Sequence, residues 1–176
     1  MNSDAPLARI CDLATLSDAG DEIAIAVAGD DLTRLAEWAG VDRVERFEGK
    51  VTLRKLAPGR FAYDAVLGAD VVQSCVVTLE PVRSHIARSF ARTLHYTPRG
   101  PVRDEGLLTL AAGDDDAPDE IASTRFDLAG PLLEEFSLAI DPYPRVPGVA
   151  FEPPEDAASP PDNPFAVLKR LKEKGG

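Results

Sequence analysis

Alternating apolar and polar residues predict a β-strand in residues 23–27 and a longer one in residues 43–56. Successive side chains of a strand point to opposite faces, so the longer strand has one apolar and one charged face. Its apolar face carries Phe47, Val51 and Leu53. The turn sequence Ala57-Pro58-Gly59 and renewed alternation in residues 61–71 then predict a long hairpin.

A third long strand is predicted in residues 83–97, where large apolar side chains again recur on one face. Pro81 has no N–H to donate to a central ladder, so we expect the chain to turn within residues 77–82. The pattern therefore predicts a three-stranded antiparallel meander preceded by an N-terminal strand.

Helical spacing of apolar residues predicts two helices, in residues 30–39 and 128–140. Asp30 or Asp31 is expected to cap the first, and Asp127 the second. Gly40 is placed to end the first helix. Two helices together with an antiparallel sheet indicate an α+β fold, in which both helices pack on the sheet.

Other stretches have too little apolar character to form a core. Residues 104–121 are predicted to be a disordered acidic loop, with a short strand at 106–110, and residues 149–162 a Pro-rich acidic linker. A short C-terminal helix is expected in residues 163–176. The predicted organisation is thus one α+β domain over residues 1–148, then the linker and the helix.

The net charge of −11 hides an asymmetry. Residues 41–103 contain 11 basic and 6 acidic side chains, whereas the remainder contains 8 basic and 24 acidic ones. RNA binding depends on Lys and Arg that neutralise phosphates, so the middle of the chain is the candidate region. The acidic flanks instead favour a basic protein as partner.

Two sets of residues are candidates for binding. A basic surface for RNA phosphates would use Arg46, Lys50, Arg54, Arg83, Arg88 and Arg92. The alternative is an ordinary charged sheet face. The C-terminal helix carries an apolar stripe that either docks on a partner or folds back on its own core, made of Phe165, Leu168 and Leu171.

The sequence indicates no catalytic, cofactor or metal site. It has no phosphate-binding glycine motif, and His85 and His95 would lie about 33 Å apart on one continuous strand. Cys11 and Cys75 are expected to be reduced thiols. We find no signal peptide and no membrane-spanning stretch, so a cytoplasmic location is expected, with no membrane partner and no small-molecule substrate.

Three segments carry a family resemblance. They are VVQSCVVTLEPV (residues 71–82), FDLAGPLLEEFSLAIDPYPRVPG (126–148) and NPFAVLKRLK (163–172). Together they resemble the YceD family, the large ribosomal RNA subunit accumulation proteins, and the first contains the signature residues Cys75, Leu79, Glu80 and Pro81. Many members have C-x-x-C there. This chain has Thr78 in place of the second cysteine, which argues against a metal or redox role.

The resemblance implies a part in accumulation or processing of 23S rRNA and brings no catalytic residue with it. We therefore expect a non-enzymatic ribosome-biogenesis factor, whose partner is an rRNA precursor or a basic ribosomal protein. An rRNA-processing nuclease or its subunit is one alternative, and an interaction adaptor unrelated to ribosomes is another. The oligomeric state stays open.

Overall fold

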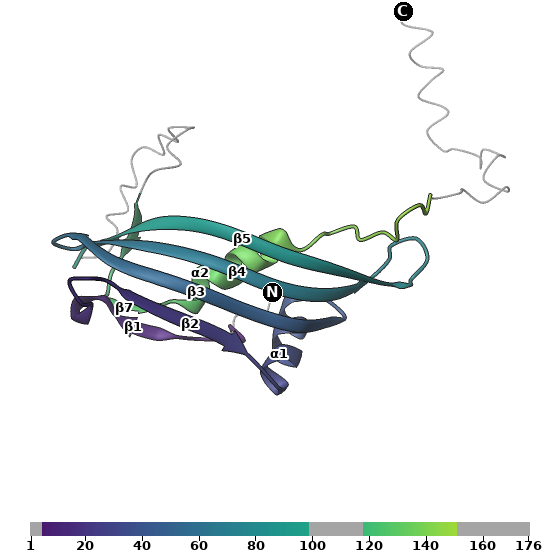
Figure 1. Ribbon diagram of the computed structural model, residues 1–176, viewed down its shortest axis with the longest axis horizontal. Coiled ribbons are helices and arrows are strands. Elements are labelled where there is room, and N and C mark those ends of the chain that lie inside the picture. Colours follow the sequence, from purple (N-terminus) through teal and green to yellow (C-terminus); the bar gives the residue numbers. More distant parts are fainter. Residues whose placement is uncertain (1–4, 99–117, 151–176) are drawn as a thin grey trace, which may run out of the picture. The chain divides into compact units, whose positions relative to one another are not determined.

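A computed structural model describes residues 5–98 and 118–150 (Figure 1). The chain divides into two compact units between Val146 and Pro147, and only residues 147–150 of the second are described. The predicted short strand at 106–110, most of the acidic loop, most of the linker and the C-terminal helix lie outside these ranges.

The first unit is built on a five-stranded sheet of order β2-β3-β4-β5-β6. The four long strands are antiparallel neighbours: β2 (Asp21–Val27), β3 (Arg43–Ala57), β4 (Arg60–Ser74) and β5 (Pro81–Tyr96). This arrangement contains the predicted N-terminal strand and meander. The sheet is wider than predicted, because β6 (Asp119–Ile121) pairs in parallel with the end of β5.

The strand β6 corrects the predicted extent of the acidic loop, which we expected to continue to residue 121. Its residues Asp119 and Glu120 face Leu94 and His95 in the ladder, so backbone pairing outweighs their poor strand propensity. A second, unpredicted sheet joins β1 (Ile10–Asp12) to β7 (Arg125–Asp127). A short 3₁₀ helix, η1 (Leu13–Thr15), follows β1.

Both predicted helices are present, α1 (Asp30–Ala39) and α2 (Ala129–Ala139). The predicted cap of α1 is wrong: its N-cap is Gly29, and Asp30 and Asp31 lie in the first turn, where carboxylates favour the helix dipole. Gly40 ends α1 in the left-handed conformation, as expected. The N-cap of α2 is Leu128, although the Asp127 carboxylate accepts the Ala129 N–H at 3.1 Å.

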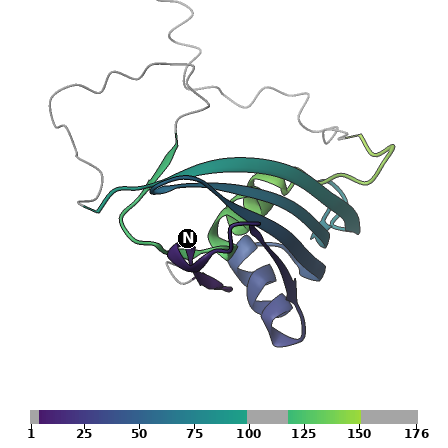
Figure 2. The same cartoon turned by 60° about the vertical axis from the view of Figure 1, so that its left-hand side comes forward.

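The core lies between the sheet and the two helices, which are on the same side of it (Figure 2). We call this side of the sheet the inner face and the opposite side the outer face. Apolar residues of the predicted alternation fill the inner face, among them Phe47, Val51, Leu53, Tyr63, Leu67 and Leu94. In α2, Phe136 packs edge-on against Phe47, with ring centroids 5.3 Å apart.

The helix α2 approaches β3 closely because residue 49 has no side chain. A Cβ added at Gly49 would lie 2.6 Å from a methyl carbon of Leu132. The Tyr63 hydroxyl, which is fully buried, donates to the Leu128 carbonyl at 2.8 Å, so this buried polar group has a partner at the start of the helix. Neither helix of the described ranges is long and apolar enough to cross a membrane.

We expect Gly49→Ala to lower the free energy of unfolding by about 1–3 kcal/mol, since the added methyl group must displace Leu132. Urea denaturation measures this change. The matched control is Gly130→Ala in α2, where an added Cβ meets nothing within 4 Å, so stability should be unchanged or slightly higher. Equal effects of the two substitutions would contradict the close packing of α2 on β3.

Candidate functional site

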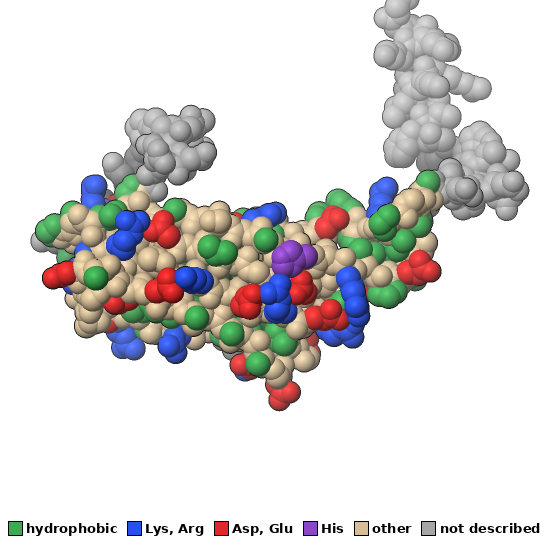
Figure 3. Space-filling view, viewed as in Figure 1, with side chains coloured by type: hydrophobic (Ala, Val, Ile, Leu, Met, Phe, Trp, Pro, Cys, Tyr) green, Lys and Arg blue, Asp and Glu red, His purple; other side chains and the backbone are tan. Residues whose placement is uncertain are grey.

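Charged side chains of β2, β3, β4 and β5 gather on the outer face (Figure 3). The structure places four of the predicted RNA-binding residues there, namely Arg46, Lys50, Arg54 and Arg83. The other two, Arg88 and Arg92, belong to the opposite face of β5, in register with Leu67 and Tyr63. The six cations therefore do not form one surface.

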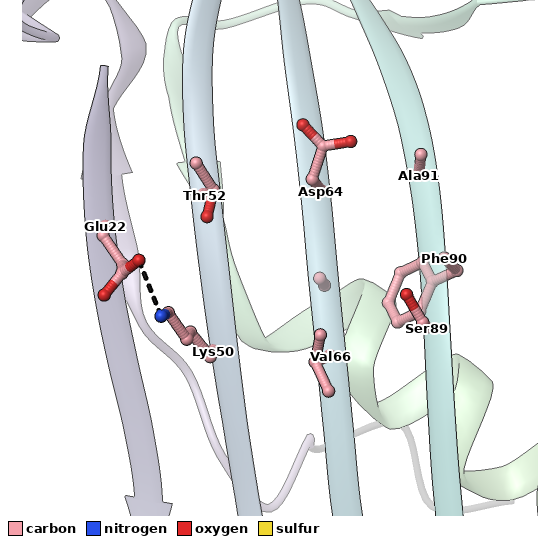
Figure 4. Close-up of a pocket in the computed structure, with 9 residues that line it drawn as sticks. Glu22, Lys50, Thr52, Asp64, Val66, Ser89, Phe90 and Ala91 are labelled. Carbon is pink, nitrogen blue, oxygen red and sulfur yellow. Dashed lines mark ion pairs between the residues drawn. The ribbon is translucent and has the colours of Figure 1, made fainter. Parts of the chain in front are cut away.

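Each outer-face cation among the candidates is paired with a carboxylate. Lys50 Nζ lies 2.8 Å from Glu22, which comes from the neighbouring strand β2 (Figure 4). Arg54 lies 2.8 Å from Asp64, and Arg83 lies 3.4 Å from Glu45. The alternation of the sequence places the basic residues on one face of a strand. It does not give the alignment of neighbouring strands, which decides the carboxylate that each cation meets.

The densest group on the outer face is centred on Asp70. One carboxylate oxygen accepts from Arg46 Nε at 2.6 Å, and the other lies 2.6 Å from His85 Nδ1. Arg46 also pairs with Glu48. Hydrogen bonds from Arg46, and then from His85, lower the pKa of Asp70. Asp70 faces Arg46 on one side and His85 on the other in the strand register.

Beside this group, the outer face has a shallow hollow of about 440 Å³. Small residues form much of its floor, including Ala24, Ala26, Gly68 and Ala87, and Arg46, Lys50 and His85 stand around it. A second hollow, of about 500 Å³, lies next to Lys50, Asp64 and Ser89 (Figure 4). In the described ranges, no group of three or more His, Cys, Asp or Glu is placed to hold a metal ion.

Arg92 has structural contacts. Its guanidinium lies 2.8 Å from Glu134 and 3.6 Å from Glu135, both in α2, and 3.7 Å from Asp119 in β6. It also lies over the Phe90 ring, and only 24% of its side chain is exposed. Arg92 therefore joins β5 to α2 and β6, and phosphate binding would have to break these contacts.

Arg88 is exposed and donates to the Ala87 carbonyl at 3.2 Å. Within residues 5–98 and 118–150 it makes no ion pair. Phe165, Leu168 and Leu171 lie outside the described residues, so their proposed docking stays a prediction.

A second candidate region is the connection between β4 and β5, residues 75–80, which we call the Cys75 loop. It contains Cys75, Leu79 and Glu80 of the signature, and Pro81 begins β5. The Cys75 N–H donates to the Glu80 carbonyl at 2.8 Å, and the Leu79 N–H to the Cys75 carbonyl at 2.9 Å. The signature segment thus ends one long strand and turns the chain into the next.

The sulfur of Cys75 is an acceptor for backbone N–H groups. Val77 and Thr78 of its own loop donate at 3.5 Å, and Val146 donates at 3.4 Å. The side chain has no exposed surface but is not part of the main core, because its own loop and residues near 146 cover it. Both cysteines are free thiols.

These hydrogen bonds lower the pKa of Cys75 to about 6, with the Thr78 side chain as the largest cause and the Val146 N–H next. Thr78 therefore stabilises the thiolate. Cys11 behaves in the opposite way, because burial, followed by the charge of Asp21, raises its pKa.

The Cys75 loop contacts residues 141–146, which follow α2 and which we call the exit segment. The Val76 N–H donates to the Pro144 carbonyl, and the Gln73 side-chain amide to the Asp141 carbonyl, both at 2.9 Å. Residues 71–82 and 126–148, two of the three segments singled out in the sequence, are therefore joined. Their separation in the chain gave no sign of this contact.

These features define an α+β protein with a charge-balanced outer sheet face and a thiol-centred loop held against the exit of its second helix. Residues 64–172 match the family described as large ribosomal RNA subunit accumulation protein YceD. The chain belongs to the YceD family, which confirms the resemblance. A comparison with curated proteins found no match, and a comparison with solved structures found none either.

We expect the stability advantage of the wild type over Cys75→Ser to grow from pH 6 to pH 9. A pKa lowered from 9.0 to about 6 on folding means that the thiolate stabilises the folded state. That contribution is complete above the unfolded pKa and is lost as pH falls through about 6. Urea denaturation of both proteins under reducing conditions measures it, and parallel pH profiles would contradict it.

Proposed function

We propose that this chain is a non-enzymatic ribosome-biogenesis factor that supports accumulation or processing of 23S rRNA during large-subunit assembly. The observation that carries the proposal is membership of the YceD family over residues 64–172, more than half of the chain. Both candidate regions overlap or adjoin the matched residues. A cytoplasmic location is part of the same proposal.

We further propose that the factor acts mainly through a basic protein of the assembling subunit, and less through rRNA phosphates. The gain on binding RNA comes largely from cations that release counterions from phosphates. On the outer face, Arg46, Lys50 and Arg54 already have carboxylate partners, so phosphates must compete with Asp70, Glu22 and Asp64. The net charge of −11 opposes RNA and attracts a basic protein.

If the proposal is right, the chain should sediment with large-subunit precursors on a sucrose gradient of a cell lysate. RNase treatment, which dismantles those particles, should move it to the top of the gradient. Cells that lack the protein should contain less 23S rRNA. The proposal would be overturned by two results together: the protein stays at the top of both gradients, and cells that lack it contain the normal amount of 23S rRNA.

One observation favours the alternative of a nuclease. Asp70 orients His85 through Nδ1, next to Arg46 and Glu48, and this leaves the other ring nitrogen available for proton transfer. RNA cleavage without a metal needs a general acid, a general base and a cation near the phosphate. The four side chains supply these groups on an open face.

We expect the purified protein to leave a 23S precursor transcript intact, with or without magnesium, because Arg46 is held by Asp70 and Glu48. Gel electrophoresis of the transcript measures this. The variants to compare are His85→Ala and, as a matched control, His95→Ala in the same strand. Cleavage by the wild type and by the His95 variant, but not by the His85 variant, would establish the nuclease instead.

A further inference from the structure

The Cys75 loop and the exit segment form one surface at the end of the sheet. Two hydrogen bonds join them, Val76 N–H to Pro144 and Val146 N–H to the Cys75 sulfur, and a third joins the end of β4 to the exit segment, from the Gln73 amide to Asp141. The surface is therefore a product of tertiary structure, because its hydrogen bonds join residues as many as 71 positions apart, in segments that the sequence singles out separately.

This surface is apolar. Val76 is 47% exposed, Leu79 77% and Tyr143 70%, and these are three of the seven large hydrophobic residues that the described structure exposes. Hydrophobic side chains gather over the β4–β5 connection in the space-filling view (Figure 3). Single exposed apolar residues are common, but a group held by a hydrogen-bonded scaffold is typical of a docking site.

Leu79 adds an independent argument. Its φ of 63° lies in the left-handed region, and it is the one non-glycine residue with positive φ in the described ranges. A glycine would fit this turn without the strain that a Cβ imposes. Because the leucine side chain is 77% exposed, burial among residues 5–98 and 118–150 does not offset that strain. Contact with another molecule would do so.

The charges around the surface indicate the kind of partner. The carboxylates of Asp42, Glu80 and Asp141 border it and make no ion pair among the described residues. Arg145 is the one cation of the exit segment, and Arg43 and Arg83 share Glu45 nearby. With a chain charge of −11, an apolar surface of this kind suits a basic amphipathic polypeptide better than RNA.

We propose that the Cys75 loop and the exit segment dock a basic, amphipathic segment of a partner protein, with Val76, Leu79 and Tyr143 as its apolar anchors. This inference rests on the proposed function. It assigns the surface and the class of partner through which the protein would support large-subunit assembly. The partner inserts aliphatic side chains between the anchors and places Lys or Arg near Glu80, Asp42 and Asp141.

The first test measures binding of purified chain to isolated large-subunit precursor particles. The variant combines Val76→Ser, Leu79→Gly and Tyr143→Ser, of which the second relieves backbone strain and so protects the fold. The matched control is Leu56→Ser, an apolar residue of similar exposure, 53%, in β3. We expect binding to weaken at least about tenfold in the triple variant, since anchor residues dominate interfaces, and not in the control.

The second test places a photo-crosslinking phenylalanine at Tyr143 and, as control, at Leu56, and adds the same particles. A crosslink from position 143 to a basic large-subunit protein, identified by mass spectrometry, is the expected result. A crosslink to rRNA, a crosslink from position 56 alone, or no crosslink would overturn the inference.

The two proposals fail in different ways. If the wild type does not bind the particles, the proposed function is wrong and this inference falls with it. If the wild type and the triple variant bind equally, and both restore 23S rRNA in cells that lack the protein, only the docking surface is wrong. A melting temperature at or above that of the wild type shows that the triple variant is folded.

Discussion

The close packing of α2 on the inner face of the sheet is the contact on which the other features depend. Gly49 allows Leu132 to approach β3. The buried Tyr63 hydroxyl donates to the carbonyl of Leu128, the N-cap residue of α2. With the helices covering one face, the charged residues of β3 and β4 must lie on the other. The same packing directs the end of α2 so that the exit segment reaches the Cys75 loop.

The Cys75 loop shows how a signature segment can have a structural role, because its backbone and sulfur hold the turn between β4 and β5 against the exit segment. Hydrogen bonds from Thr78 to the sulfur lower the pKa of Cys75. The sulfur also accepts the Val146 N–H from the exit segment. The Cys75 side chain therefore accepts hydrogen bonds from backbone N–H groups of two segments that are distant in the chain.

The outer face illustrates why a basic stretch of sequence is not the same as a basic surface. Four of its ion pairs join residues on neighbouring strands, such as Arg46 with Asp70 and Lys50 with Glu22, and a fifth, Arg83 with Glu45, reaches from β5 across β4 to β3. The cations that suggested RNA binding are largely neutralised where they stand.

The sequence by itself determined the long strands, their inner and outer faces, the two helices and the family. Each of these depends on local periodicity or on contiguous motifs, as the alternation of Phe47, Val51 and Leu53 shows. Only the tertiary structure decided that β6 and the β1–β7 sheet form, that Arg92 joins α2 to β5, and that Asp70 pairs with Arg46 and His85. These are set by strand register and by contacts between residues far apart in the chain, which no local pattern encodes.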